Sequence, residues 1–155
     1  MGLCGVPPAE SLGVDAVILV GLEGVGIKSP EQLPTLTSIT WGKREIKVPL
    51  VAAGGIGDAR GFLGALGMGA DGIMMGTAFM ATKECPISDA AKERLVRASP
   101  DDLGGQVLGV VNPQDRLGSL AVAVIDHVPT VKELVDSIVR GAEELLASWQ
   151  FLKTR

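Results

Sequence analysis

The stretch Val48-Pro49-Leu50-Val51-Ala52-Ala53-Gly54-Gly55-Ile56-Gly57-Asp58 decides the fold. Its apolar first half is short and bounded by turn residues, which predicts a buried strand over 48–53. Pro49 lies at the start of that strand, where a missing N–H donor is tolerated. The glycines then predict a tight turn, and Asp58 is a suitable N-cap for a helix that runs to about Gly67. Strand, glycine loop and helix together form one βα unit.

Two further units flank this one. Residues 69–72 turn the chain, 73–75 predict a short strand, and Gly76-Thr77 leads into another helical stretch. Upstream, the apolar run 14–20 predicts a strand and residues 35–46 predict a helix. Because strands alternate with helices, the sequence favours βαβ units and a parallel sheet, and therefore an α/β fold.

The rest of the chain predicts helices. Ser88 is a suitable N-cap for a helix through Ala98, and Thr130-Val131-Lys132-Glu133 has the capping-box pattern of a helix start. The apolar run 121–125 is compatible with a further strand. We expect a single domain, 1–155, with a loose leader at 1–12, βα units with phosphate-binding loops at 13–98, and a C-terminal segment at 99–155 that holds a helix over about 130–148.

Composition narrows the class of protein. The chain has 155 residues, a net charge of −4 and only 3% aromatic residues, so it lacks the basic and aromatic surface that binds nucleic acid. No apolar run is long enough to span a membrane. The sequence shows no metal-binding pattern, because its only cysteines and histidine are Cys4, Cys85 and His127. We therefore expect no bound metal. Unpaired thiols are typical of a reducing compartment, which favours a cytoplasmic location.

Two glycine turns carry the functional prediction. Gly54-Gly55 and Gly76-Thr77 each follow a strand, and Gly55 and Gly76 are 21 residues apart, which is the length of one βα unit. The two turns should therefore be neighbours at one edge of the sheet. Glycine has no Cβ, so a phosphate can approach the backbone N–H groups closely. In (β/α) barrels a phosphate site is commonly built by the loops after the last two strands. This chemistry predicts phosphate binding but leaves the phosphate carrier open.

Several long motifs resemble a known family. Residues 48–61 resemble the seventh-strand motif of nitronate monooxygenases, formerly called 2-nitropropane dioxygenases, and residues 69–82 resemble their eighth strand and its phosphate loop. Residues 83–87 match a common continuation of that motif. Residues 129–134 resemble the start of the family's C-terminal helix.

The resemblance implies an FMN-dependent oxidoreductase on a (β/α)8 TIM-type barrel, either a nitronate monooxygenase or a relative such as an FMN-dependent enoyl reductase. In that family the first Gly-Gly and the later Gly-Thr hold the FMN phosphate. Those cofactor-binding roles carry to Gly54, Gly55, Gly76 and Thr77. A small-molecule substrate is implied if the chain is active.

The chain departs from the family in two respects. Where the family has a loop of the Glu-Ala-Gly-Gly-His type, this sequence has Glu23-Gly24-Val25-Gly26-Ile27, and Ile27 cannot transfer a proton. The catalytic residue is therefore unassigned. About three βα units are present, with C-terminal helices, whereas a barrel needs eight units and roughly 200 residues or more. The missing strands could come from a second copy or from a partner chain. Alternatively, the chain is a catalytically silent structural or assembly fragment.

Other features have more ordinary interpretations. Residues 21–29 approach a Walker A loop, but Ile27 separates Gly26 from the lysine that should follow it. His127 is expected at the surface or at a helix cap rather than in catalysis. Glu23 is the one acidic residue near the expected cofactor, and a solvated position is the alternative to a role in the site.

Overall fold

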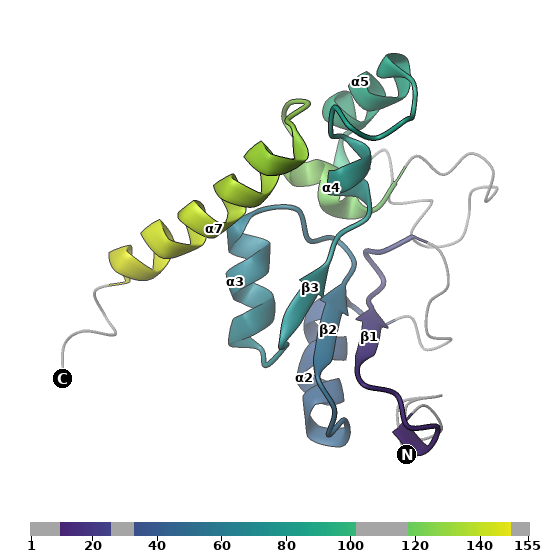
Figure 1. The fold of residues 1–155 in the computed structure, drawn as a ribbon, viewed down its shortest axis with the longest axis vertical. Coiled ribbons are helices and arrows are strands. Elements are labelled where there is room, and N and C mark those ends of the chain that lie inside the picture. Colours follow the sequence, from purple (N-terminus) through teal and green to yellow (C-terminus); the bar gives the residue numbers. More distant parts are fainter. Residues whose placement is uncertain (1–9, 26–32, 102–117, 150–155) are drawn as a thin grey trace.

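Three strands form one parallel sheet in the order β1-β2-β3, as the sequence predicts (Figure 1). The computed structural model describes residues 10–25, 33–101 and 118–149. The strands are β1 (Val17–Val20), β2 (Leu50–Ala53) and β3 (Gly72–Met74), with helix α2 (Thr35–Glu45) between the first two and α3 (Ala59–Gly67) between the last two. Consecutive βα units in a parallel sheet are therefore confirmed.

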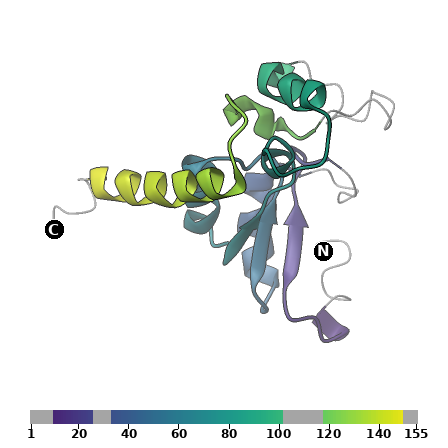
Figure 2. The same cartoon turned by 45° about the horizontal axis from the view of Figure 1, so that its top comes forward.

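Helices α2 and α3 cover one face of the sheet (Figures 1 and 2). Because side chains alternate along a strand, every second residue points to this face. Leu50 and Ala52 of β2 are completely buried here and belong to one cluster with Ile39 of α2 and Ala65 of α3. The main core is thus the layer between the sheet and these two helices.

The opposite face of the sheet is bare in the part of the chain that the structure describes. Ile18 of β1 and Met74 of β3 are 51% and 50% exposed, although both belong to strands. Ile18 is in register with Val51, and Met74 with Ala53. In a closed barrel this face points to the interior, where side chains from all strands pack in layers. The fold is therefore α/β, and its three units form part of a TIM-type barrel.

Carboxylates hold together the edge of the sheet where the strands begin. Asp71 Oδ2 accepts hydrogen bonds from Leu50 N and Lys43 Nζ, both at 2.9 Å. These bonds lower the pKa of Asp71 below its usual value. Glu10 accepts a bond of 2.6 Å from Lys47 N, just before β2. Residue 10 of the leader is thus attached to the sheet, whereas residues 1–9 lie outside the described ranges.

The helices of the C-terminal half are α4 (Thr77–Met80), α5 (Asp89–Arg97), the 3₁₀ helix η2 (Leu120–Val124) and α7 (Val131–Ser148). Ser88 caps α5 by accepting a bond from Ala91 N, as expected. Helix α7 lies against α3 and extends beyond it (Figure 2). At this contact a Cβ on Gly141 would lie 2.8 Å from Ala59 Cβ, so the helices approach closely. Across the described ranges, no helix is both long and apolar enough to cross a bilayer.

The expectation of a strand at 121–125 is wrong. This segment forms η2, whose first turn is capped by Ser119 Oγ, which accepts a bond of 3.3 Å from Ala121 N. The helix ends with a bond of 3.2 Å from Ile125 N to Val122 O. A short apolar run does not by itself distinguish a strand from a buried helical turn. The local cap at Ser119 gives Ala121 N an acceptor, so this N–H group needs no partner on a neighbouring strand.

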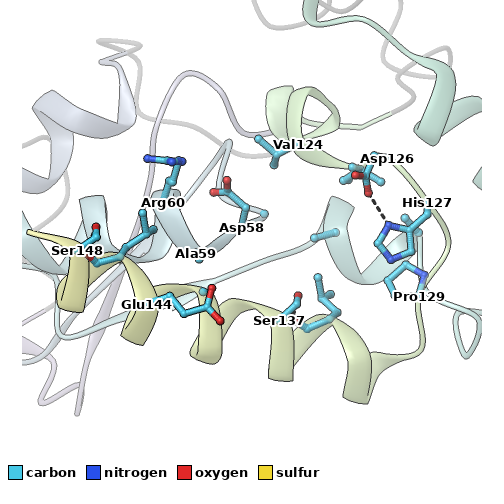
Figure 3. A pocket seen from close by; sticks show the side chains of 17 residues that line it. Asp58, Ala59, Arg60, Val124, Asp126, His127, Pro129, Ser137, Glu144 and Ser148 are labelled. Atoms are coloured by element: carbon cyan, nitrogen blue, oxygen red, sulfur yellow. Dashed lines mark hydrogen bonds and ion pairs between the residues drawn. The ribbon is translucent and has the colours of Figure 1, made fainter.

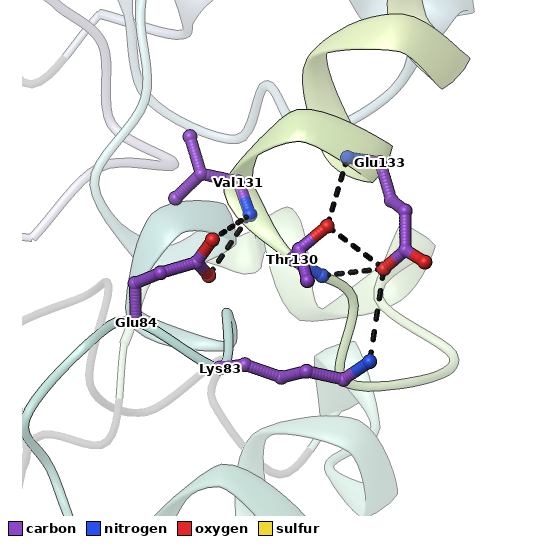
Figure 4. A network of polar contacts seen from close by, with 5 residues as sticks. All are labelled: Lys83, Glu84, Thr130, Val131 and Glu133. Atoms are coloured by element: carbon purple, nitrogen blue, oxygen red, sulfur yellow. Dashed lines mark hydrogen bonds and ion pairs between the residues drawn. The ribbon is translucent and has the colours of Figure 1, made fainter.

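The N-terminus of α7 is held by a network of polar contacts (Figure 4). Thr130 and Glu133 form the predicted capping box, in which Glu133 N donates to Thr130 Oγ1 and Thr130 N donates to Glu133 Oε2. From the loop after α4, Glu84 accepts a bond from Val131 N at 2.9 Å. Lys83 Nζ lies 3.8 Å from Glu133 Oε2. The network attaches α7 to the loop that follows α4.

This network predicts a dependence of stability on pH. Hydrogen bonds from Thr130 N and Thr130 Oγ1, with the charge of Lys83, lower the pKa of Glu133 below its ordinary value of 4.5. The contribution of Glu133 is therefore complete above that pH and is lost as pH falls through the lower folded-state pKa. Glu133→Gln should lower the free energy of unfolding at pH 7, and its difference from the wild type should shrink in acid.

Urea unfolding at a series of pH values measures this difference. Glu143→Gln is the matched control, because Glu143 lies on the same helix, is exposed and has a side chain that forms no hydrogen bond with a described residue. A Glu133→Gln difference that stays constant from neutral pH into acid would contradict the assignment.

Candidate functional site

The loops that follow β2 and β3 meet at one cavity. Gly54 and Gly55 follow β2, Gly76 and Thr77 follow β3, and all four line a cavity of about 330 Å³. The sequence-based expectation that the two turns are neighbours is confirmed, because β2 and β3 pair directly in parallel. None of the described residues that line this cavity carries a positive charge. The other lining residues are Val20, Gly24, Val25, Ala53, Ile56, Met74, Met80, Gly118 and Ser119.

Gly54 and Gly55 are required by the backbone itself. Their φ angles are +105° and +73°, in the region that strongly favours glycine. A Cβ on Gly54 would lie 2.9 Å from Gly24 N, and one on Gly55 would lie 2.9 Å from Glu23 Cβ. These two glycines therefore allow the loop after β2 to pack closely against the loop after β1, whatever ligand the cavity takes.

Gly76 is different, because neither its conformation nor its packing requires glycine. Its φ is −106°, which any residue can adopt. A Cβ at this position would meet no atom within 4 Å. Since Gly76 lines the cavity, the missing side chain leaves open space directly beside the backbone. That space is what a ligand needs in order to approach the main-chain N–H groups.

Several hydrogen-bond donors at the cavity have no partner within the described residues. The backbone N–H groups of Gly55, Gly76 and Thr77 donate to none of them. Thr77 is only 6% exposed, and its Oγ1 accepts a bond of 2.9 Å from Ser119 N. Its hydroxyl proton is donated to no described residue. Thr77 is buried and Gly55 is half-buried, and donors in such positions are normally paired, whereas Gly76 is exposed. Together these donors fit an anionic ligand.

Gly118 and Ser119 are lining residues that the sequence did not predict. They lie just before η2, at the end of the unpatterned stretch 99–120, and no motif or spacing marks them. A Cβ on Gly118 would lie 2.8 Å from Thr77 Cγ2, so the segment packs directly on Thr77. Ser119 N then fixes one lone pair of the Thr77 hydroxyl. Contacts between residues this far apart in the chain leave no local signal in a single sequence.

The N-terminus of α3 is capped by a side chain of the chain itself. Asp58 caps this helix, and its Oδ1 accepts a bond of 2.8 Å from Gly61 N. A carboxylate of the chain therefore already occupies the helix N-terminus, and Asp58 does not line the cavity. Helix α4 begins at Thr77 but has only four residues. The site depends on individual N–H and O–H donors rather than on a helix dipole.

Glu23 is half-buried and bonded within the protein, so the expectation of a solvated position is wrong. Its Oε2 accepts a bond of 2.7 Å from Thr35 N and lies 2.7 Å from Thr35 Oγ1. Glu23 is not among the residues that line the cavity. Ile27, at the position expected for a histidine, lies outside the described residues.

A second cavity of about 530 Å³ shares no lining residue with the first (Figure 3). It lies between α3, α4, η2 and α7 and is lined on its rim by Asp58, Arg60, Asp126 and His127. The His127 side chain is 72% exposed, and its Nδ1 lies 2.5 Å from Asp126 Oδ1. This contact lowers the pKa of Asp126. His127 is therefore at the surface, as expected, and away from the predicted phosphate site. Among the described residues, no cluster of three or more metal-ligating side chains occurs.

The different roles of the glycines are testable by stability measurements. Gly54→Ala should lower the free energy of unfolding by about 1–2 kcal/mol or more, because alanine is strained at positive φ and its Cβ would contact Gly24. Gly76→Ala should change it by less than about 0.5 kcal/mol, as exposed substitutions usually do. Urea denaturation monitored by circular dichroism measures both. Equal losses in the two variants would contradict the assignment.

Comparisons with known proteins show the family and the fold of this chain. A family model described as nitronate monooxygenase matches residues 6–106. A probable nitronate monooxygenase of Staphylococcus aureus strain Newman is 29% identical over 160 residues, which cover 90% of this chain and 45% of the relative. Its counterpart in strain JH9 is 32% identical over 151 residues, covering 88% of this chain and 42% of the relative. The chain thus spans less than half the length of these relatives.

Solved structures share the fold. FabK from Thermotoga maritima superposes with a TM-score of 0.83 at 23% identity, covering 97% of this chain and 61% of that chain. A nitroalkane oxidase from Streptomyces ansochromogenes gives 0.76 at 19% identity, covering 95% of this chain and 57% of that chain. Because the family model covers most of the chain and contains both glycine turns, this chain belongs to the nitronate monooxygenase family.

Proposed function

We propose that this chain carries the phosphate-binding part of an FMN-dependent oxidoreductase of the nitronate monooxygenase type. The observation that supports this proposal is a group of hydrogen-bond donors at one cavity. No described acceptor is present for the N–H groups of Gly55, Gly76 and Thr77 or for the Thr77 hydroxyl. A terminal phosphate monoester such as that of FMN offers enough oxygen acceptors for all of them. Membership of the family supports FMN over other phosphate carriers.

Each cavity residue has a separate role in this proposal. Gly54 shapes the turn, and Gly55 and Gly76 present N–H groups without a side chain of their own. Thr77 adds a hydroxyl donor whose oxygen is held by Ser119 N. The apolar side chains of Val20, Met74 and Met80 line the same cavity, and burial of this side by further βα units would exclude water from it. Donors in a partly dry environment bind an anion more strongly than donors in bulk water.

FMN, when bound, would supply the electron transfer, because the redox chemistry belongs to the cofactor. The chain's own residues would bind its phosphate and fix its orientation. No catalytic base is assigned among the described residues. The substrate would be a small molecule that reacts at the flavin ring, as the names nitronate monooxygenase and nitroalkane oxidase indicate for the relatives.

The bare face of the sheet supports a further part of the proposal. Ile18 and Met74 are exposed on the side that a closed barrel would cover. Additional βα units, from a partner chain or from a second copy, would bury this face and extend the sheet beyond β1 and β3. They would also enclose the flavin ring, which extends beyond a cavity that holds the phosphate.

FMN binding tests the proposal directly. Titration of the full chain with FMN, followed by flavin fluorescence, should give saturable binding. Thr77→Val should raise the Kd for FMN about tenfold or more, because a hydrogen bond to a charged group contributes about 1.5–3 kcal/mol. Thr77→Ser keeps the hydroxyl and should bind nearly as the wild type does. Gly55→Asp should abolish binding by placing a carboxylate beside the phosphate.

The controls separate loss of binding from loss of fold. Circular dichroism should show that Thr77→Val and Thr77→Ser are folded at the temperature of the titration. A wild-type chain that shows no binding at high micromolar FMN contradicts the proposal.

A further inference from the structure

We propose that Glu23 is a positioning residue of the phosphate cavity. Through its hydrogen bonds, Glu23 holds the loops after all three strands in place. This inference rests on the proposed function, because a positioning role requires that the cavity binds phosphate. The hydrogen bonds from which it is argued are present in the chain without FMN. Glu23 lies in the loop after β1, whereas the proposed phosphate donors lie in the loops after β2 and β3. The residue reaches each of those loops through an intermediate segment: its side chain bonds Thr35, and its main chain bonds Leu120.

The side chain connects β1 to the loop after β2. Glu23 Oε2 accepts a bond of 2.7 Å from Thr35 N, the first residue of α2. The N-cap residue of this helix is Pro34, which forms no side-chain cap, so Glu23 supplies the missing acceptor from another segment. Thr35 Oγ1 lies 2.7 Å from Glu23 Oε2 and 2.9 Å from Gly54 O. Its single proton can be donated to only one of these oxygens at a time, and the bridge between Glu23 and Gly54 is completed by the bond from Thr35 N to Glu23 Oε2.

Packing reinforces this bridge. Thr35 is only 9% exposed, so its hydroxyl has little access to water. A Cβ on Gly54 would lie 3.0 Å from Thr35 Oγ1, and a Cβ on Gly55 would lie 2.9 Å from Glu23 Cβ. The Glu23 and Thr35 side chains therefore support the turn at Gly54 and Gly55 from the side away from the cavity. A shift of either side chain would move the N–H group of Gly55.

The main chain of Glu23 connects β1 to the loop after β3. Glu23 O accepts a bond of 3.0 Å from Leu120 N. The preceding residue, Ser119, donates its N–H to Thr77 Oγ1 at 2.9 Å. Two adjacent backbone amides thus link Glu23 to Thr77. Glu23 is thus linked to Gly54 by Thr35, and it is linked to Thr77 by Ser119. These two links fix the distance between the loop after β2 and the loop after β3.

The charge of Glu23 suits this position. A carboxylate close to a phosphate would repel it, but Glu23 does not line the cavity. Its charge lies instead at the N-terminus of α2, where the helix dipole favours a negative group. Bonds to an ionised acceptor are roughly twice as strong as bonds to a neutral one. Glutamine at this position would keep the shape but weaken the bridge.

The test combines FMN affinity with amide exchange. In Glu23→Gln, the Kd for FMN should rise about tenfold relative to the wild type. Thr35→Val removes the hydroxyl that contacts Glu23 and Gly54, and it should raise the Kd by a similar factor. Thr35→Ser keeps that hydroxyl and should bind as the wild type does. Glu45→Gln is the charge control, because Glu45 is exposed on α2 and its side chain forms no hydrogen bond with a described residue.

Hydrogen–deuterium exchange of the free chain provides a readout that does not require FMN. In Glu23→Gln, exchange should become faster at Ser119 and Leu120, whose N–H groups are bonded to Thr77 Oγ1 and Glu23 O, and remain unchanged in α7. A variant that unfolds at a lower temperature, yet keeps wild-type FMN affinity and wild-type exchange at Ser119 and Leu120, would show that Glu23 only caps α2 and overturn the inference. If the wild type binds no FMN, the proposed function fails, and the exchange data still decide whether Glu23 holds the two loops.

Discussion

The hydrogen-bonded pairing of β2 with its two parallel neighbours is the constraint on which the rest of the structure depends. Parallel strands all point the same way, so the loops that follow them leave the sheet at one edge. The three strands are only three or four residues long, and a displacement of one strand by a single residue would separate the loops. The cavity exists because the register places Ala53 beside both Val20 and Met74.

The two edges of the sheet serve different purposes. Where the strands begin, Asp71 and Glu10 use their carboxylates to satisfy backbone N–H groups and to hold neighbouring segments together. Where the strands end, Gly55, Gly76 and Thr77 leave N–H groups without a described acceptor. One edge therefore stabilises the fold, while the other keeps donors available. This division is common in α/β barrels, whose ligand sites lie at the carboxyl ends of the strands.

Features encoded by neighbouring residues could be predicted from the sequence. The three strands, the caps at Asp58, Ser88 and Thr130, and the proximity of the two glycine turns follow from short motifs and from the length of a βα unit. Features created by distant contacts could not be predicted. The run 121–125 forms a 3₁₀ helix because Ser119 caps it locally, and Ser119 reaches Thr77 only in the folded chain. The role of Glu23 likewise depends on Thr35.

The absence of cationic side chains from the described lining of the phosphate cavity has a kinetic consequence. If the cavity binds phosphate as proposed, an approaching dianion would meet a chain of net charge −4 and no cation among the described lining residues to guide it. Capture would then rely on random encounters that place the phosphate between the two loops. Added electrolyte should screen the mild repulsion and slightly speed this capture, the reverse of what a lysine-lined pocket would show. Retention, once the ligand has entered, would depend on the geometry of the donors and hardly on ionic strength.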